Sequence, residues 1–312
     1  MATNTNYAPP FPTLDGNGNF TQSWLEHAPQ IVLRELRTIA QQHFVLPNVL
    51  KGRIDGTGSG AFIVELMESI YADRDPIPVD QLGGYPLVTT TGATTMLAKT
   101  VKRGLSAYIS DEAIARMRID EVRRTLVKIG NSLVKVSDTV GMAAIGSAVT
   151  QTQAAAGKWD GSTTTPDPLS DVLLAQAQIF SRGQGYKADT FLGTPNAVAR
   201  LTAQAVKMGV MPRETNNQFE AGLVKVIGDM QILTSPYLPS GVNGIVLDST
   251  MLGGIGFEVL GGGYVGDPAD PWGVESKTWH DDEKDAWKVQ ARKVAVPIVN
   301  EPGAAVIVTG IF

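Results

Sequence analysis

The apolar positions of residues 110–146 form a single stripe with helical spacing. From Ile119 onward they recur alternately three and four residues apart, so they share one face of an α-helix. They are Ile119, Val122, Leu126, Ile129, Leu133, Val136, Val140 and Ala143. Ser110 can cap the first turn, and no proline interrupts the run, although Gly130 could kink it. The pattern predicts one helix on the order of 50 Å long. Val and Ala are weak coiled-coil seam residues, so we expect this helix to lie on a sheet.

The stretch before this helix has the pattern of a projecting hairpin. Residues 69–108 are rich in threonine and β-prone, with prolines and glycines near the middle. They predict two long strands joined by a turn around Asp80–Pro86. So little large apolar content cannot stabilise a hairpin alone in water, so the hairpin should lie on another molecule. The polar residues 1–20 predict an extended arm, which a neighbouring subunit would hold.

The second half of the chain alternates between helical and strand patterns. A helix is predicted in 169–183, capped by Ser170 or Asp171 and stopped at Gly183. A short strand in 186–194 leads to a helix over 195–207, and buried strands follow in 227–239 and 241–260. This alternation indicates a compact α/β domain with a mixed sheet. The last residues predict two strands joined at Glu301-Pro302-Gly303.

The composition narrows the function classes. The chain has 312 residues, 43% hydrophobic and 18% charged, with a net charge of −5 and no cysteine. An acidic chain argues against a sequence-specific nucleic-acid binder. The missing cysteines exclude disulfides, thiolate catalysis and Cys-zinc sites. The first residues lack the apolar core of a signal peptide, and no apolar run reaches membrane-spanning length, so we expect a soluble protein made in a cytoplasm.

One glycine cluster formally fits a nucleotide-binding motif. The sequence GTGSGA, Gly56–Ala61, matches G-x-G-x-x-A, and Asp80 lies about twenty residues further on. The motif needs a buried strand before it and a helix at its last glycine. The preceding LPNVLKGRID is polar and contains a proline. We therefore favour a flexible hinge at the base of the hairpin.

Other clusters with possible chemistry are weak. WHDDEKD places His280 beside Asp282, but adjacent acidic residues usually line a solvated loop rather than converge on a metal. His27 and His43 stand alone, and Gly261–Gly263 fit a long surface loop better than an anion cradle. No nucleophile elbow, phosphate loop or zinc-protease motif occurs. We expect no enzyme activity, no cofactor and no metal.

Basic residues gather on the hairpin's return strand and along the predicted helix. They are interleaved with acidic residues at Asp111, Glu112, Asp120 and Glu121. Two interpretations stay open for the helix: intrahelical pairing on a solvated face, or charge matching between subunits. We expect the inter-subunit contacts to include Asp80, Tyr85, Lys99, Lys102, Arg103, Arg116 and Arg123, and Arg118 and Arg124 belong to the same basic concentration.

Three stretches together resemble a known family. DQLGGYPLVTT followed by LAKTVKRGLSAYISDEAI is similar to an extended loop that runs into a spine helix. YKADTFLGTPNAVARL is similar to the entry of an axial domain, and ARKVAVPIVNEPGAAVIVTGIF to closing peripheral strands. In this order they resemble the major capsid protein of tailed double-stranded DNA bacteriophages, the Hong Kong phage capsid fold that encapsulins share.

The resemblance implies an α+β fold with four parts. These are an N-terminal arm over 1–28, an extended loop over 53–109, an axial domain over 166–266, and a peripheral domain. The peripheral domain would comprise 29–52, 110–165 and 267–312, with the spine helix at about 110–146.

The resemblance also implies a structural role. Copies would form hexamers and pentamers of an icosahedral shell enclosing double-stranded DNA without sequence-specific binding and without a membrane. Scaffolding, portal and decoration proteins are possible further partners, and the protein would be made in the host bacterial cytoplasm and end in the virion capsid. Some family members cross-link a loop lysine to a neighbour's asparagine with help from a glutamate. Lys99 or Lys102 could meet Asn300 and Glu301 in those roles, but we expect no cross-link, because nothing in the motif fixes these positions.

Other classes remain open. An encapsulin-type compartment has the same fold, but encapsulins usually begin with a helix and carry a shorter loop. A nucleotide-dependent enzyme built on GTGSGA and a minor capsid or tail protein are further alternatives, although tail-tube folds are all-β.

Overall fold

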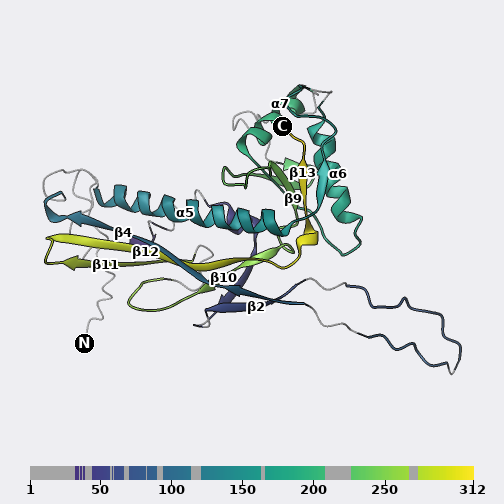
Figure 1. The fold of residues 1–312 in the computed structure, drawn as a ribbon, viewed down its shortest axis with the longest axis horizontal. Helices are drawn as coiled ribbons and strands as arrows, with labels where there is room; N and C mark the ends of the chain where they lie inside the picture. Colours follow the sequence, from purple (N-terminus) through teal and green to yellow (C-terminus); the bar gives the residue numbers. More distant parts are fainter. Residues whose placement is uncertain are drawn as a thin grey trace, which may run out of the picture.

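A computed structural model describes the chain in several ranges separated by short gaps. These are 32–34, 36, 38, 44–56, 58, 60–66, 70–81, 83–89, 94–113, 121–162, 166–207, 226–266 and 273–312. Two sheets are joined by one long helix, and a long loop projects beyond the second sheet, which makes the molecule elongated (Figure 1). The predicted N-terminal arm lies outside the described residues.

The first sheet, which we call the long sheet, is built around β12 (Ala286–Val299). One edge of β12 pairs with β4 (Val101–Ser110), and the other pairs in turn with β11 (Val274–Asp281) and β10 (Gly253–Glu258). β1 (Gly52–Gly56) adds to β10 in parallel. Alternate residues of the strands face opposite sides, and one side lies against α5 (Glu121–Ala148). Trp287, Val289 and Ala291 pack there, as their alternation predicted.

The helix α5 confirms the long helix in its described part. Its 28 residues make it about 42 Å long. The predicted stripe is buried at Val122, Leu126, Ile129 and Leu133, and then it fails, because Val136 is 43% exposed. An α-helix has 3.6 residues per turn, so a stripe that averages 3.5 drifts around the helix. The buried face continues instead at Val134, Asp138, Met142 and Ile145.

The second sheet, which we call the axial sheet, has six strands and is the main core. Its order is β5-β13-β9-β6-β8-β7, with both parallel and antiparallel neighbours. The strands are β5 (Thr152–Ala154), β6 (Thr190–Gly193), β7 (Val226–Ile227), β8 (Met230–Thr234), β9 (Gly244–Leu247) and β13 (Ala305–Thr309). All four residues of β6 and of β9 are buried, as expected for strands covered on both faces.

Two helices pack on the axial sheet. The bounds of α7 (Pro195–Lys207) match the predicted helix. The predicted cap of α6 (Pro168–Phe180) is wrong, because Asp167 accepts the capping bond from the Ser170 amide at 3.1 Å. Pro168 fits the first turn, so the helix starts before the expected serine. Gly183 follows the helix end with φ +69°, as the stop signal predicted.

The projecting hairpin is shorter in hydrogen-bonded strand than predicted. Only β2 (Ala61–Glu65) and β3 (Thr95–Lys99) pair, and the described residues 70–81 and 83–89 beyond them contain no strand. Pro76, Pro78 and Pro86 lack the backbone N–H that a ladder needs, which explains the missing strands. The turn is where it was expected, since the Gly83 amide donates to the Asp80 carbonyl at 2.9 Å. From here on, the term extended loop means residues 66–94, a narrower range than the 53–109 expected from the sequence.

Strand pairing departs from the expected domain bounds at five strands, of which β5, expected in the peripheral domain, pairs with β13 in the axial sheet. β1 and β4, assigned to the extended loop by the sequence, belong to the long sheet. β10 lies in the long sheet rather than with its neighbour β9, and β13 lies in the axial sheet rather than with β12. Short segments make these crossings, including the 3-10 turn η2 (Pro302–Ala304). Adjacent buried strands look alike in sequence, so the pattern did not show that the chain changes sheet.

Candidate assembly surfaces

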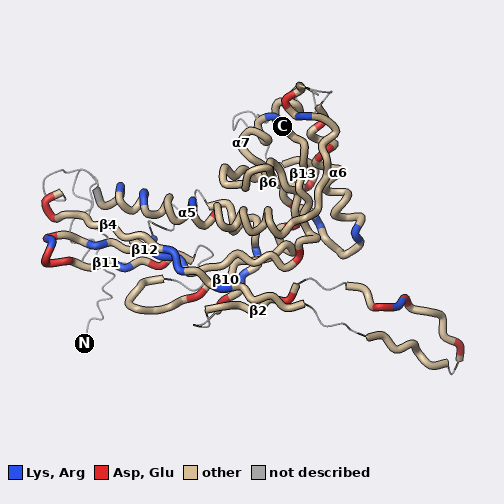
Figure 2. Tube along the Cα trace, in the orientation of Figure 1, with Lys and Arg blue, Asp and Glu red and all other residues tan. Residues whose placement is uncertain are grey.

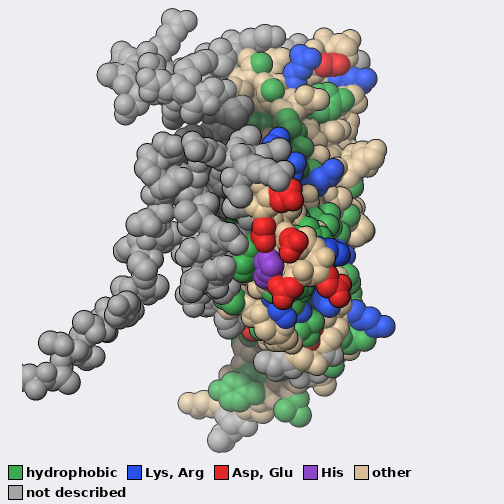
Figure 3. All heavy atoms as spheres, turned by 90° about the vertical axis from the view of Figure 1, so that its left-hand side faces the viewer, with side chains coloured by type: hydrophobic (Ala, Val, Ile, Leu, Met, Phe, Trp, Pro, Cys, Tyr) green, Lys and Arg blue, Asp and Glu red, His purple; other side chains and the backbone are tan. Residues whose placement is uncertain are grey.

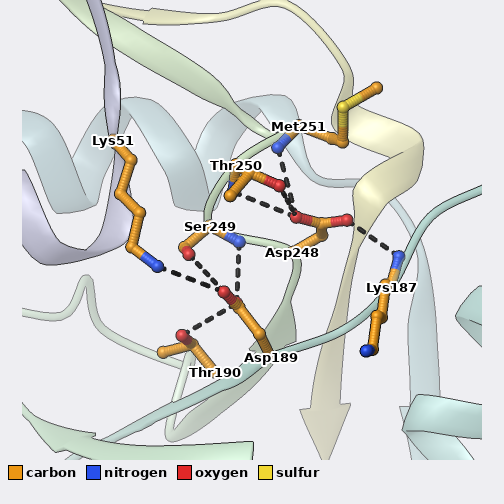
Figure 4. A network of polar contacts seen from close by, with 8 residues as sticks. All are labelled: Lys51, Lys187, Asp189, Thr190, Asp248, Ser249, Thr250 and Met251. Carbon is orange, nitrogen blue, oxygen red and sulfur yellow. Dashed lines mark hydrogen bonds and ion pairs between the residues drawn. The ribbon is translucent and has the colours of Figure 1, made fainter.

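A network of polar contacts fastens the two sheets where the chain crosses from β9 to β10 (Figure 4). The Asp248 carboxylate accepts from the amides of Lys187, Thr250 and Met251. The Asp189 carboxylate accepts from the Ser249 amide and hydroxyl and forms a 3.2 Å ion pair with Lys51, which immediately precedes β1. Burial raises the pKa of Asp189, but the hydroxyl and amide donors outweigh it and hold the pKa below the usual range.

The base of the hairpin is clamped to the long sheet. The buried Glu258 carboxylate on β10 accepts from the Thr100 hydroxyl at 2.7 Å and from the Gly60 amide at 3.1 Å. Phe62, Val64 and Ala98 pack with Ile298 of β12 into a small core. The stem of the loop is therefore held rigidly although the loop itself projects.

The glycine cluster acts as a connection between two strands. β1 ends at Gly56 and β2 begins at Ala61, so the helix that a dinucleotide site requires is replaced by a strand. Gly58 and Gly60 both have φ +68°, a conformation that glycine adopts without strain. The cluster lies at the base of the hairpin, as expected, and its action as a hinge stays a prediction.

The predicted contact residues fall into two groups, one on the loop and one near the start of β4, and the side chains of the remaining two lie outside the described part of the structure. Asp80 and Tyr85 lie on the extended loop, where Tyr85 is 86% exposed. Lys99 and Lys102 are exposed beside the bend between β3 and β4. Arg103 lies on the α5 side instead, where it lines a small cavity with Ser137, Val140 and Lys293. Arg116 and the side chain of Arg123 lie outside the described residues, as do Arg118, His27 and His43.

The end of the long sheet far from the axial sheet carries an acidic surface around a histidine (Figure 3). His280 contacts Asp111 at 2.9 Å and Asp282 at 2.5 Å, and its ring packs edge-on against Trp287. Hydrogen bonds to Asp111 and then Asp282 raise the pKa of His280. Among the described residues no group of three ligands could hold a metal ion, and no helix could cross a membrane.

A buried carboxylate secures the segment that enters β1. Asp138 on α5 is 0% exposed and accepts from the amides of Val45 and Leu46 at 3.3 and 3.1 Å. These amides lie at the start of the short helix α3 (Leu46–Val49). Burial raises the pKa of Asp138 to about 6 despite these bonds and the nearby Lys293.

A row of alternating cations and rings, which was not predicted from the sequence, lies on the face of the long sheet away from α5. We call it the lysine–aromatic row. It comprises Arg292, Tyr264, Lys277, Trp279, Lys288, Tyr108 and Lys284. The available signal was the two-residue alternation in β11 and β12, which puts Lys277, Trp279 and Lys288 on one face.

A cavity near these surfaces has charged side chains in its lining, but these already have partners within the chain. It has a volume of about 200 Å³ and lies at the hairpin base beside Phe257 and Val294. Its charged lining is already paired within the chain: Arg53 with Asp55, and Glu275 with Arg292. We therefore expect the outer surfaces, and not this cavity, to carry the function.

Comparison with known proteins shows the family of this chain. A family model described as phage capsid protein matches residues 93–308, more than half of the chain. The chain belongs to the phage capsid protein family. It is a phage capsid protein, a structural protein whose place is the virion capsid.

Solved structures agree with this capsid protein in fold. The capsid structure of cyanophage P-SCSP1u is 14% identical in sequence and has a TM-score of 0.56. The match covers 82% of this chain and 85% of the cyanophage chain. Microbacterium phage Oxtober96 is 10% identical, with coverages of 86% and 91% and a TM-score of 0.58. The virus-like particle from Pyrococcus furiosus is 13% identical, with coverages of 89% and 98% and a TM-score of 0.54. No curated protein sequence matches the chain.

Proposed function

We propose that this capsid protein assembles into hexamers and pentamers around double-stranded DNA, and that the extended loop makes the contacts between neighbouring copies. The observation that carries the proposal is the exposure of large apolar side chains on the loop. Tyr85 and Leu87 are 86% and 89% exposed, and Ile77 is 61% exposed. Such a surface is stable in water only when another molecule covers it.

The mechanism is mechanical. The stem is fixed by Glu258 and the core around Phe62, so contacts made by the loop act directly on the long sheet. Each contact is modest, but the closed shell multiplies it, because each subunit is held by several neighbours. The acidic chain suits the enclosure of DNA, because DNA can enter without adhering. No catalytic step is required.

We further propose that the shell is not covalently cross-linked. Asn300 and Glu301 lie where β12 leaves the long sheet, and both backbone amides donate to the Leu252 carbonyl. The Glu301 carboxyl bonds Tyr186, and its pKa is raised chiefly by burial. Both side chains also have an oxygen buried at the joint between the sheets, Asn300 Oδ1 and Glu301 Oε2, rather than presented to a neighbour's Lys99 or Lys102. Boiling assembled particles in detergent tests this: we expect a monomer band, and a ladder of oligomers would refute it.

Expression of the chain alone tests the assembly. We expect shells, or rings of five or six copies, in light scattering on a sizing column and in negative-stain images. Rings without shells would indicate that a scaffolding protein is needed. A monomer that stays monomeric at every salt and protein concentration would overturn the proposal. Nucleic acid inside particles from infected cells supports a virus, whereas protein cargo would indicate a compartment. Portal and decoration proteins would be further partners of the virion shell.

A further inference from the structure

The lysine–aromatic row holds its cations in fixed positions. Lys277 lies 5.9 Å from the Tyr264 ring centre and 5.5 Å from that of Trp279. Lys288 lies 5.1 Å from both Trp279 and Tyr108, and Lys284 lies 4.3 Å from Tyr108. An ammonium group over a ring face is attracted by the ring's quadrupole. Each central lysine is therefore held between two rings instead of moving freely in solvent.

Two of the four cations in the row lack an acidic partner within the described part of the chain. Lys277 donates to the Gly262 carbonyl at 3.2 Å but forms no ion pair there, and neither does Lys288. Lys284 approaches Asp281 only at 4.0 Å. Arg292 at the end of the row already pairs with the buried Glu275. The row thus presents at least two positive charges whose positions are prepared for an anionic partner.

The opposite end of the molecule carries the complementary charge. The described residues 70–81 of the extended loop contain three aspartates, Asp73, Asp75 and Asp80, against one arginine, Arg74. All four are exposed. Figure 2 shows this acidic loop at one end and the strands of the row toward the other, so the loop cannot reach the row of its own chain.

We propose that the lysine–aromatic row binds the acidic extended loop of a second copy of this chain. The inference rests on the proposed function and names the surface that the loop meets. Opposite charges at opposite ends of an elongated subunit favour head-to-tail contacts, which close into rings when the rotation permits. Rings that hold the lysines also lower the entropy lost on binding, and charge matching selects the correct register.

Charge reversal with compensation tests this pairing in the full chain. Lys277→Glu with Lys288→Glu should reduce the assembled fraction by about tenfold or more, because two acidic surfaces then face each other. Asp75→Lys with Asp80→Lys should do the same from the other side. The four substitutions together should restore assembly. Lys128→Glu with Lys135→Glu, on the exposed side of α5, is the matched control and should assemble like the wild type.

The remaining outcomes are equally decisive. If the wild type assembles and the Lys277/Lys288 variant assembles equally well, the inference is wrong although the proposed function stands. The inference is also wrong if the combined variant assembles no better than either pair alone while circular dichroism shows it folded. If the lysine pair leaves assembly intact and lowers only the binding of a short DNA duplex, the row binds nucleic acid and not a second copy. A wild type that never assembles fails the proposed function itself.

Discussion

The two sheets of this capsid protein are built from similar residues but face different surroundings. The axial sheet is covered on both faces, and its strands β6 and β9 are buried at every residue. Among the described residues, α5 covers one face of the long sheet, and the other face carries the hairpin base at Ile298 and the lysine–aromatic row. One sheet is a core for its own chain, whereas the other keeps a face available for partners. The difference predicts where mutations should affect folding and where they should affect assembly.

The largest loss of stability should come from the axial sheet. Phe191 on β6 is fully buried, and its ring centre lies 6.4 Å from that of Trp159. Its ring lies against Gly193 and Gly244, where a Cβ would come within 3.0 and 3.1 Å of it. Phe191→Ala should lower the free energy of unfolding by about 3 to 5 kcal/mol, because a closed core cannot collapse around the cavity. Urea denaturation measures it. Leu105→Ala on exposed β4 is the control, and an equal loss there would erase the contrast between the sheets.

A smaller loss should follow from disturbing the edge of the long sheet. A Cβ at Gly254 would lie 2.4 Å from the Gly52 carbonyl oxygen, so Gly254→Ala pushes β1 away from β10. We expect a loss of about 1 to 3 kcal/mol, together with faster proteolysis at the hairpin base. Gly84→Ala, where the added Cβ meets nothing, is the control. Unchanged protection of β1 amides in hydrogen exchange would contradict this account.

The helix that covers the long sheet should respond to pH through Asp138. Its pKa is about 6 in the folded protein and 3.8 in the unfolded reference, so the folded state holds the proton more tightly. This group therefore adds stability that is full below pH 4 and is lost as pH rises through about 6, on the order of 2 to 3 kcal/mol.

Comparison of Asp138→Asn with the wild type across pH 4 to 7 isolates this contribution. The difference in unfolding free energy between the two proteins should change over that window. Asp160→Asn is the control: hydrogen bonds from Ser162 lower the pKa of Asp160, so its contribution changes only below about pH 4 and the difference should stay constant across this window. A difference that stays constant with pH would show that Asp138 does not titrate there.

The smallest effect should appear at the distal end of the long sheet. The pKa of His280 is raised by Asp111 and Asp282, so its stabilising charge is present below about pH 6.5 and is lost as pH rises through the folded value. His280→Phe should remove that pH dependence while keeping a ring against Trp287. The His280 ring signals in NMR titration measure it, and an unshifted midpoint would contradict the assignment.

Local patterns predicted elements better than they predicted partners. α7 begins at a proline that follows a strand and has the expected bounds, because its signals are contained in thirteen neighbouring residues. The fold class and capsid family also followed from the order of segments. The hydrogen bonds of Asp138 to the start of α3, those of Glu258 to the hairpin base, and the lysine–aromatic row join residues separated by up to about two hundred positions. No local period in the sequence encodes such contacts. Both ends of the α5 stripe looked alike in sequence, and only packing showed where the buried face turns.

The central strand has a further consequence for how the subunit resists force. β12 bonds with three strands along its fourteen residues, and only Asn300–Ala304 separate its end from β13 in the other sheet. Tension between the sheets therefore pulls β12 along its own axis. Hydrogen bonds loaded in that direction share the load and must rupture together, whereas bonds at a peeled edge open one at a time. A shell made of such subunits should yield first at the contacts between copies and only later within a subunit.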